Sequence, residues 1–166
     1  AYKKENIIAQ YIELENGEQD AIKIEKIASA YLPLHRKSYY LTHFYGGWGA
    51  EMKMKEEQLT PGTKSIEART GILTTESVNS SFMLSADAPA QEGTGEIYAG
   101  SLAWSGNYKM TFELDKYGIL HMVGGINPYA SMLLIEPGKK IKMPEMIWTY
   151  SSCGRGQISR NYHDWC

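Results

Sequence analysis

The spacing of turn-forming residues is the feature that most constrains how this chain folds. Glycine, proline, asparagine and aspartate recur about every ten residues, and the segments between them alternate apolar and polar residues. Alternation with a period of two is typical of strands, and regularly spaced turns favour an antiparallel sandwich. Helical periodicity is almost absent before residue 153. We therefore predict an all-β antiparallel sandwich for residues 1–152.

Two strand pairs are indicated by the residues that separate them. Residues 108–114 and 119–126 flank the short turn sequence DKYG, in which aspartate and glycine favour a tight reversal. Residues 81–86 and 96–106 flank the sequence DAPAQEGTG, which is rich in turn formers. We expect each of these pairs to form neighbouring antiparallel strands.

Two further hairpins are predicted from local turn signals. Asn16-Gly17 separates residues 7–16 from residues 21–32, and an Asn-Gly pair between alternating segments is a strong hairpin signal. Pro137-Gly138 lies between apolar segments in the same way. The short polar segment 64–70 is typical of an edge strand or of a strand exposed on both faces.

The last residues, 153–166, differ from the rest because they have helical periodicity. Ile158, Tyr162 and Trp165 recur at intervals of four and three residues, so that a helix places them in one apolar stripe. Such a stripe must be buried against another surface. We expect it to cover the sheet, to meet another domain or copy, or to remain as an exposed association surface.

Composition excludes several functional classes. The chain has 166 residues, 43% of them hydrophobic, which suits one domain with a real core. Its formal net charge of −2 predicts no nucleic-acid surface. Its apolar runs are too short to cross a membrane. We find no amino-terminal signal sequence and expect a cytoplasmic protein.

Cysteine and histidine offer no obvious chemistry. A helix between Cys153 and Cys166 would separate their Cα atoms by roughly 20 Å, whereas a disulfide needs about 4.4–6.8 Å. We expect two free thiols and a reducing compartment. The four histidines share no metal-ligand spacing, so neither a metal nor another cofactor is expected. They are His35, His43, His121 and His163.

Several motifs follow one another in a fixed order along the chain. They are G-x-W-x-x-E at Gly46–Glu51, Y-x-x-S-x-x-W-S-G-N at Tyr98–Asn107, G-I-N-P at Gly125–Pro128, the Pro-Gly turn at Ile135–Gly138, Pro144–Glu145, Trp148–Ser151 and Gly154–His163. In this order and spacing the chain resembles the amino-terminal domain of the family 36 glycoside hydrolases, the bacterial α-galactosidases. The resemblance extends over about the whole chain.

The resemblance implies a galactose-mutarotase-like β-supersandwich, of which this chain is a later part, followed by a catalytic (β/α)₈ barrel outside the chain. It also implies retaining hydrolysis of terminal α-galactosyl residues in sugars such as melibiose and raffinose. Retaining enzymes use two facing carboxylates, and the resemblance assigns both to the barrel. Asp20, Asp87, Asp115 and Asp164 are then structural, and we expect this chain alone to be inactive.

The resemblance also suggests which residues contact other parts of the enzyme. Trp48 lies in a Gly-rich loop and is predicted to stack on sugar at the rim of the active site; the alternative is a tryptophan anchored in the core. Residues 153–166 would be the linker helix that leads to the barrel. Ile158, Arg160, Tyr162 and Trp165 are then predicted contacts with the barrel or with another copy in a homo-oligomer.

Two other functions remain open. A free-standing carbohydrate-binding module would use exposed aromatic side chains, and binding of galactose, melibiose or raffinose by the isolated chain would favour it. A mutarotase-like epimerase would need a histidine and a glutamate that face one pocket as general acid and base. His43 and His121 are the candidates for that histidine.

Overall fold

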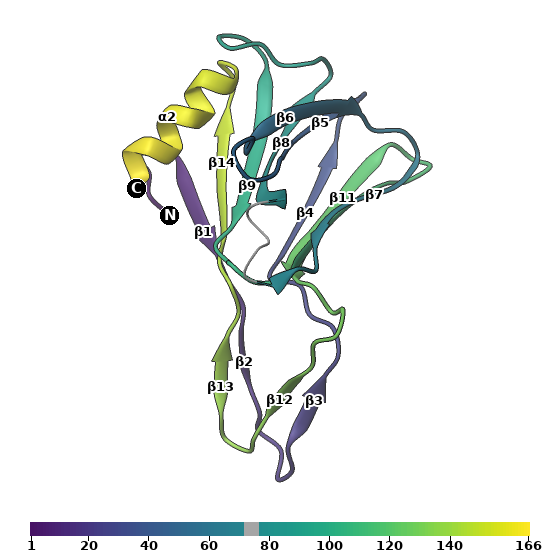
Figure 1. The fold of residues 1–166 in the computed structure, drawn as a ribbon, viewed down its shortest axis with the longest axis vertical. Helices are drawn as coiled ribbons and strands as arrows, with labels where there is room; N and C mark the ends of the chain where they lie inside the picture. Colours follow the sequence, from purple (N-terminus) through teal and green to yellow (C-terminus); the bar gives the residue numbers. More distant parts are fainter. Residues whose placement is uncertain (72–76) are drawn as a thin grey trace.

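The computed structural model describes residues 1–71 and 77–166, and a sandwich of two antiparallel sheets dominates them (Figure 1). One sheet has the strand order β1-β14-β9-β8-β5-β6 and the other has the order β4-β11-β10-β7. The first sheet contains β1 (Ile7–Gln10), β14 (Met146–Ser151), β9 (Glu96–Leu102), β8 (Val78–Ala86), β5 (Tyr39–Tyr45) and β6 (Lys53–Gln58). The second contains β4 (Ala30–His35), β11 (Ile119–Ile126), β10 (Tyr108–Leu114) and β7 (Gly62–Ala68). The predicted all-β class is confirmed.

The core lies between the two sheets because alternate residues of each strand face inward. Met110 and Phe112 of β10 and Phe82 of β8 are all buried. The rings of Phe82 and Phe112 meet edge to face, with their centroids 4.9 Å apart. Gly100 of β9 lies against the Phe82 ring, and a Cβ atom there would come within 2.7 Å of it. Glycine at this position therefore lets an aromatic side chain fill the core.

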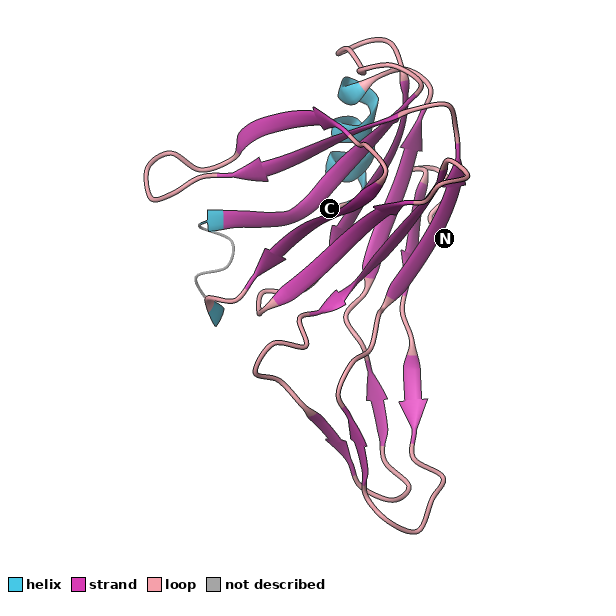
Figure 2. Cartoon of the chain, turned by 90° about the vertical axis from the view of Figure 1, so that its right-hand side faces the viewer, coloured by secondary structure: helices cyan, strands magenta, loops and turns pink. Residues whose placement is uncertain are grey.

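A slender arm extends away from the sandwich, downward in Figure 1. It consists of two ribbons, each with two antiparallel strands (Figure 2). In one ribbon β2 (Glu13–Glu15) pairs with β13 (Lys140–Lys142), and in the other β3 (Ile22–Ile24) pairs with β12 (Leu133–Ile135). Isolated two-stranded ribbons are marginally stable, so the arm depends on contacts between its ribbons.

The arm shows that both hairpins predicted from Asn16-Gly17 and Pro137-Gly138 are wrong. Both turns exist, but the strands on either side of one turn pair with the strands on either side of the other. Within residues 7–16, Ile7–Gln10 forms a separate strand, β1, which pairs with β14 instead. Turn residues specify where the chain reverses and leave the partner strand to be chosen by packing.

Asn16 connects the two turns at the tip of the arm. Its buried amide donates hydrogen bonds to the carbonyl oxygens of Asp20 at 2.9 Å and Ile135 at 2.8 Å. Its side-chain oxygen accepts a hydrogen bond from the Glu18 N–H. Its backbone carbonyl accepts another from the Gly138 N–H at 2.8 Å. A buried polar side chain with all these partners holds the ribbons in register.

The other predicted pairings are confirmed. β10 and β11 form a hairpin, and β8 pairs with β9 across the predicted loop. β7 is an edge strand that pairs with β10, as the polar sequence of residues 64–70 indicated.

One helix, α2 (Arg155–Trp165), covers the outer face of the first sheet and packs on β14, β1 and β9 (Figure 1). Its start is held by backbone groups of the β8–β9 loop, because the Arg155 and Gly156 N–H groups donate to the carbonyls of Gln91 and Glu92. Gly154 has a φ of 79°, and a Cβ there would come within 2.5 Å of the Gln91 oxygen. Glycine at this position lets the helix end approach the loop closely.

Candidate functional site

The loop between β5 and β6 presents Trp48 to solvent. The Trp48 side chain is 89% exposed, so the alternative of a tryptophan anchored in the core is excluded. Gly46 makes the tight loop possible, since a Cβ there would lie 2.4 Å from the Ala50 oxygen. The indole is thus displayed at the end of a hairpin, where it can stack on a flat apolar surface such as one face of a pyranose.

Glu51 stabilises this loop through a hydrogen bond to its backbone. Its carboxylate accepts a hydrogen bond from the Gly49 N–H at 2.9 Å. Backbone hydrogen bonds, first from its own N–H and then from that of Gly49, lower the pKa of Glu51. Three more large apolar side chains, Tyr45, Met52 and Met54, are exposed on the same hairpin. The hairpin therefore combines a braced backbone with an apolar surface.

The predicted stripe on α2 is real, and this chain's own sheet covers it. Ile158 is fully buried with Ala90, Ile97 and Ala99. The Tyr162 hydroxyl donates to the Ile147 carbonyl at 3.1 Å, and burial raises the pKa of Tyr162.

Trp165 and Arg160 lie nearer the surface. The ring of Trp165 meets Tyr2 edge to face, with centroids 5.9 Å apart. Arg160 is exposed and donates to Gln157 on the same helix. Of the three outcomes expected for the stripe, the structure shows the first, because Ile158 and Tyr162 pack on the sheet of this chain. The interdomain or oligomer role of these four residues stays a prediction.

The aspartates of the turns have local structural roles. Asp115 accepts hydrogen bonds from the Tyr117 and Ile119 N–H groups, and Asp87 accepts one from the Lys37 N–H. These bonds explain why aspartate is favoured there and agree with a non-catalytic assignment.

His43 does not supply the acid–base arrangement that an epimerase needs. Both of its ring nitrogens are buried, and Nε2 lies 3.6 Å from Glu57 Oε1. Burial is the main reason why the pKa of His43 is lowered. Lys64 holds Glu57 in an ion pair at 2.7 Å. A histidine and glutamate this close, with the imidazole shielded, leave no room for a sugar between them.

His121 is also engaged by neighbours. Its Nδ1 lies 2.7 Å from the Tyr31 hydroxyl, and its Nε2 lies 3.3 Å from Asp115 Oδ2. Glu113 is its cross-strand neighbour on the same face, but both ring nitrogens of His121 already have partners. The epimerase alternative therefore gains no support from either histidine.

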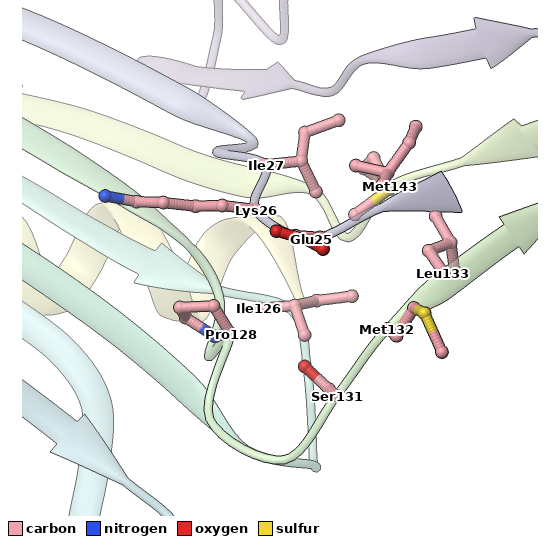
Figure 3. Close-up of a pocket in the computed structure, with 10 residues that line it drawn as sticks. Glu25, Lys26, Ile27, Ile126, Pro128, Ser131, Met132, Leu133 and Met143 are labelled. Carbon is pink, nitrogen blue, oxygen red and sulfur yellow. The ribbon is translucent and has the colours of Figure 1, made fainter. Parts of the chain in front are cut away.

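Two of the hollows in the described part of the chain differ in what they can hold. One, at the root of the arm, has a volume of only about 70 Å³. Figure 3 shows Met132, Leu133 and Met143 on its arm side and Ile126 and Pro128 on its sandwich side. Since small-molecule sites are typically about 300–1,000 Å³, it is too small for a sugar.

The other hollow is a groove of about 310 Å³ between the edge strands β1 and β4. Aromatic rings of Tyr31, Tyr98, Trp148 and Tyr150 line it, with Ile8 at its edge. No sequence motif indicated this groove, although alternation along β1 leaves Ile8 on a face that a partner must cover. Its lining is mostly apolar, which suits packing better than recognition of many hydroxyl groups.

A metal-binding cluster and a membrane-spanning helix are not found in the described part of the chain. No group of three histidine, cysteine, aspartate or glutamate residues is placed to hold a metal ion within residues 1–71 and 77–166. No helix among those residues is long and apolar enough to cross a membrane. Cys153 and Cys166 are free and exposed, as predicted.

Comparison with known proteins gives one consistent result. Residues 1–136 match the family described as the glycosyl hydrolase family 36 N-terminal domain. α-Galactosidase AgaA of Geobacillus stearothermophilus is 29% identical over 99% of this chain and 22% of its own length. α-Galactosidase Mel36A of Lactobacillus acidophilus is 28% identical over 98% of this chain and 22% of its own length.

Solved structures agree with these matches. A variant of AgaA from Geobacillus stearothermophilus in complex with stachyose has a TM-score of 0.92 at 30% identity, over 99% of this chain and 23% of that one. The α-galactosidase of Lactobacillus brevis has a TM-score of 0.93 over 99% of this chain and 22% of that one; at 24% identity it supports the fold alone. The chain thus spans about a fifth of the length of the relatives it matches.

Proposed function

The chain belongs to the glycosyl hydrolase family 36 N-terminal domains, and from that membership we propose that it is a non-catalytic segment of a retaining α-galactosidase. The complete enzyme would remove terminal α-galactosyl residues from oligosaccharides such as melibiose and raffinose. The observation that carries this proposal is the family match over residues 1–136, joined by relatives that are themselves named α-galactosidases.

The chemistry of such an enzyme explains what this segment would leave to the rest of the polypeptide. A retaining glycosidase places two carboxylates about 5–5.5 Å apart, one as nucleophile and one as acid and base. The aspartates of the two turns described above are committed to backbone hydrogen bonds. We therefore assign the catalytic pair to a (β/α)₈ barrel in the same polypeptide, and this segment would act as its scaffold.

Trp48 is the residue through which the segment would reach the substrate. Its exposed indole, on a loop held by Gly46 and Glu51, is suited to stack on the apolar face of a galactosyl unit at the pocket rim. The scaffold would also contribute an interface in a cytoplasmic homo-oligomer. Both roles follow from the resemblance and from the exposure of this hairpin.

The test of the rim role uses the complete enzyme with raffinose as substrate. Trp48→Ala should raise KM about three- to tenfold with little change in kcat, which corresponds to the loss of about 1 kcal/mol of substrate binding. Tyr117→Ala is the matched control, because Tyr117 is a 70% exposed aromatic residue on another hairpin turn. Equal KM values for the two variants would remove the rim role. Absence of α-galactosidase activity from the complete polypeptide would overturn the whole proposal.

A second experiment distinguishes the scaffold function from that of a carbohydrate-binding module. The aromatic groove favours this alternative. The isolated chain is titrated calorimetrically with galactose, melibiose and raffinose. The scaffold predicts neither hydrolysis nor measurable binding at millimolar sugar. Binding that is lost when Trp148 is replaced would assign the groove as a sugar site instead.

A further inference from the structure

The hairpin that carries Trp48 stands at the margin of the first sheet. β6 is the edge strand and pairs with β5 alone, in a register that joins Thr42 to Glu56 and Tyr45 to Lys53. β5 is itself held on its other side by β8, in a ladder that shifts register between His43 and Tyr45. Among the described strands, β6 has a partner on one side only, so side chains at its base supply the further contacts that fix this strand and the loop.

One such side chain reaches the outer face of the sheet. Glu56 forms an ion pair with Arg155, the first residue of α2, and also accepts a hydrogen bond from the Thr42 hydroxyl at 3.1 Å. Both partners of the ion pair are less than a quarter exposed. This pair joins residues that are 99 positions apart in sequence and connects the hairpin to the helix.

The next residue reaches the opposite face. Successive side chains of a strand alternate between faces, so Glu57 points between the two sheets. Its Oε1 lies 2.7 Å from Lys64 Nζ on β7, a strand of the second sheet, and 3.6 Å from His43 Nε2. The hydrogen bond from Lys64 is the main reason why the pKa of Glu57 is lowered.

We propose that Glu56 and Glu57 act as a two-sided clamp that sets the orientation of β6 and of the Trp48 loop relative to α2 and to the second sheet. The consequence for substrate rests on the rim role proposed above, but the clamp itself is independent of it. Arg155 and Lys64 are then positioning residues, because they act on Trp48 through the two carboxylates.

The geometry gives the clamp leverage over Trp48. Three register steps separate Thr42–Glu56 from Tyr45–Lys53, so the loop begins about 10 Å beyond the clamp at about 3.4 Å per residue. The β5 end of the loop is held by the Gly46 N–H, which donates to the Ser77 carbonyl at 2.9 Å, but β6 has no such second partner in the part of the chain that the structure describes. A tilt of β6 by about 10° at the clamp would move its end of the loop by ~2 Å, which is enough to break a stacking contact. A partner domain that displaces α2 would in this way alter the position of Trp48.

The direct test measures amide hydrogen exchange of the chain by NMR. Glu56→Gln and Glu57→Gln should each speed exchange of the amides in residues 44–55 at least tenfold. The hairpin of β10 and β11 serves as the internal reference and should stay unchanged. Glu13→Gln is the matched control, because this exposed carboxylate of β2 lies outside the reference hairpin and has no ion-pair partner among the described residues. Exchange in residues 44–55 that stays within twofold of the control would overturn the clamp.

A charge exchange guards against variants that merely unfold. The double variant Glu56→Arg with Arg155→Glu restores an ion pair of opposite sense and should recover most of the lost protection. If each single variant loses protection and the double variant recovers none, the ion pair is not what holds the hairpin. The proposal then fails for the outer face.

The link to Trp48 is tested in the complete enzyme. Glu57→Gln should raise KM for raffinose while leaving kcat unchanged, and it should have no further effect in a Trp48→Ala background. An equal increase of KM in both backgrounds would separate the clamp from Trp48. If Trp48→Ala itself leaves KM unchanged, the rim role fails while the exchange result still decides the clamp.

Discussion

Replacement of Ile158 by alanine tests the packing of α2 most sharply, because this side chain is fully buried. The change removes three carbons, and at about 0.8 kcal/mol for each buried methylene the lost transfer free energy is about 2.4 kcal/mol. Ala90 and Ala99 are too short to fill the space, so a residual cavity adds ~1–2 kcal/mol. The free energy of unfolding should therefore fall by about 3.4–4.4 kcal/mol.

Urea unfolding followed by far-ultraviolet circular dichroism and tryptophan fluorescence measures this loss. Ile158→Val should cost only about 0.5–1.5 kcal/mol. Arg160→Ala on the exposed face of the same helix should change stability by less than about 0.5 kcal/mol. A cost below about 1 kcal/mol for Ile158→Ala would refute the reasoning, because it would mean that α2 contributes little by docking on the sheet.

Three other perturbations have clear expected results. Asn16→Asp keeps the shape of the side chain but sets a carboxylate against two carbonyl oxygens, so the unfolding free energy should fall by about 2–4 kcal/mol in urea titrations. The pKa of Glu57 is lowered in the folded state, so its stabilising contribution is present above the ordinary value of 4.5 and lost as pH falls through the lower folded value. Acid unfolding should accordingly be less steep in Glu57→Gln. Burial, followed by a hydrogen bond to Glu96, raises the pKa of Tyr98 to about 12. The free energy of unfolding should therefore decline as pH rises above 10, and Tyr98→Phe should reduce that decline. Phenolate absorbance is the readout.

Local patterns predicted those parts of the fold in which neighbours in sequence are neighbours in space. The β10–β11 hairpin follows from alternation around a short turn, and the stripe of Ile158, Tyr162 and Trp165 follows from helical periodicity. Each of these two predictions depends only on residues that lie close together in the sequence. The sequence pattern is sufficient for such elements.

The arm and the clamp lay beyond this kind of reasoning because their partners are distant in sequence. Asn16 reads locally as the start of a hairpin, yet it bonds to Ile135 and crosses between two turns. Glu56 and Glu57 lie in the charged run MKMKEE, for which no partner was predicted. Two consecutive charges on an alternating strand nevertheless require one to face inward, and that signal could have identified the pair. Their partners, Arg155 and Lys64, could not be found without coordinates.

The junction of Asn16 and Gly17 also has a chemical consequence. An asparagine followed by glycine is the sequence most prone to spontaneous deamidation, because the unhindered next backbone nitrogen can attack the side-chain carbonyl. In the folded arm the amide nitrogen is held by two carbonyl oxygens, which restrains the rotation that the attack requires. Molecules in which the tip of the arm opens during storage should lose the Asn16 amide and gain one negative charge. The product would carry aspartate at position 16, and its carboxylate would face the two carbonyl oxygens and keep the tip from closing again.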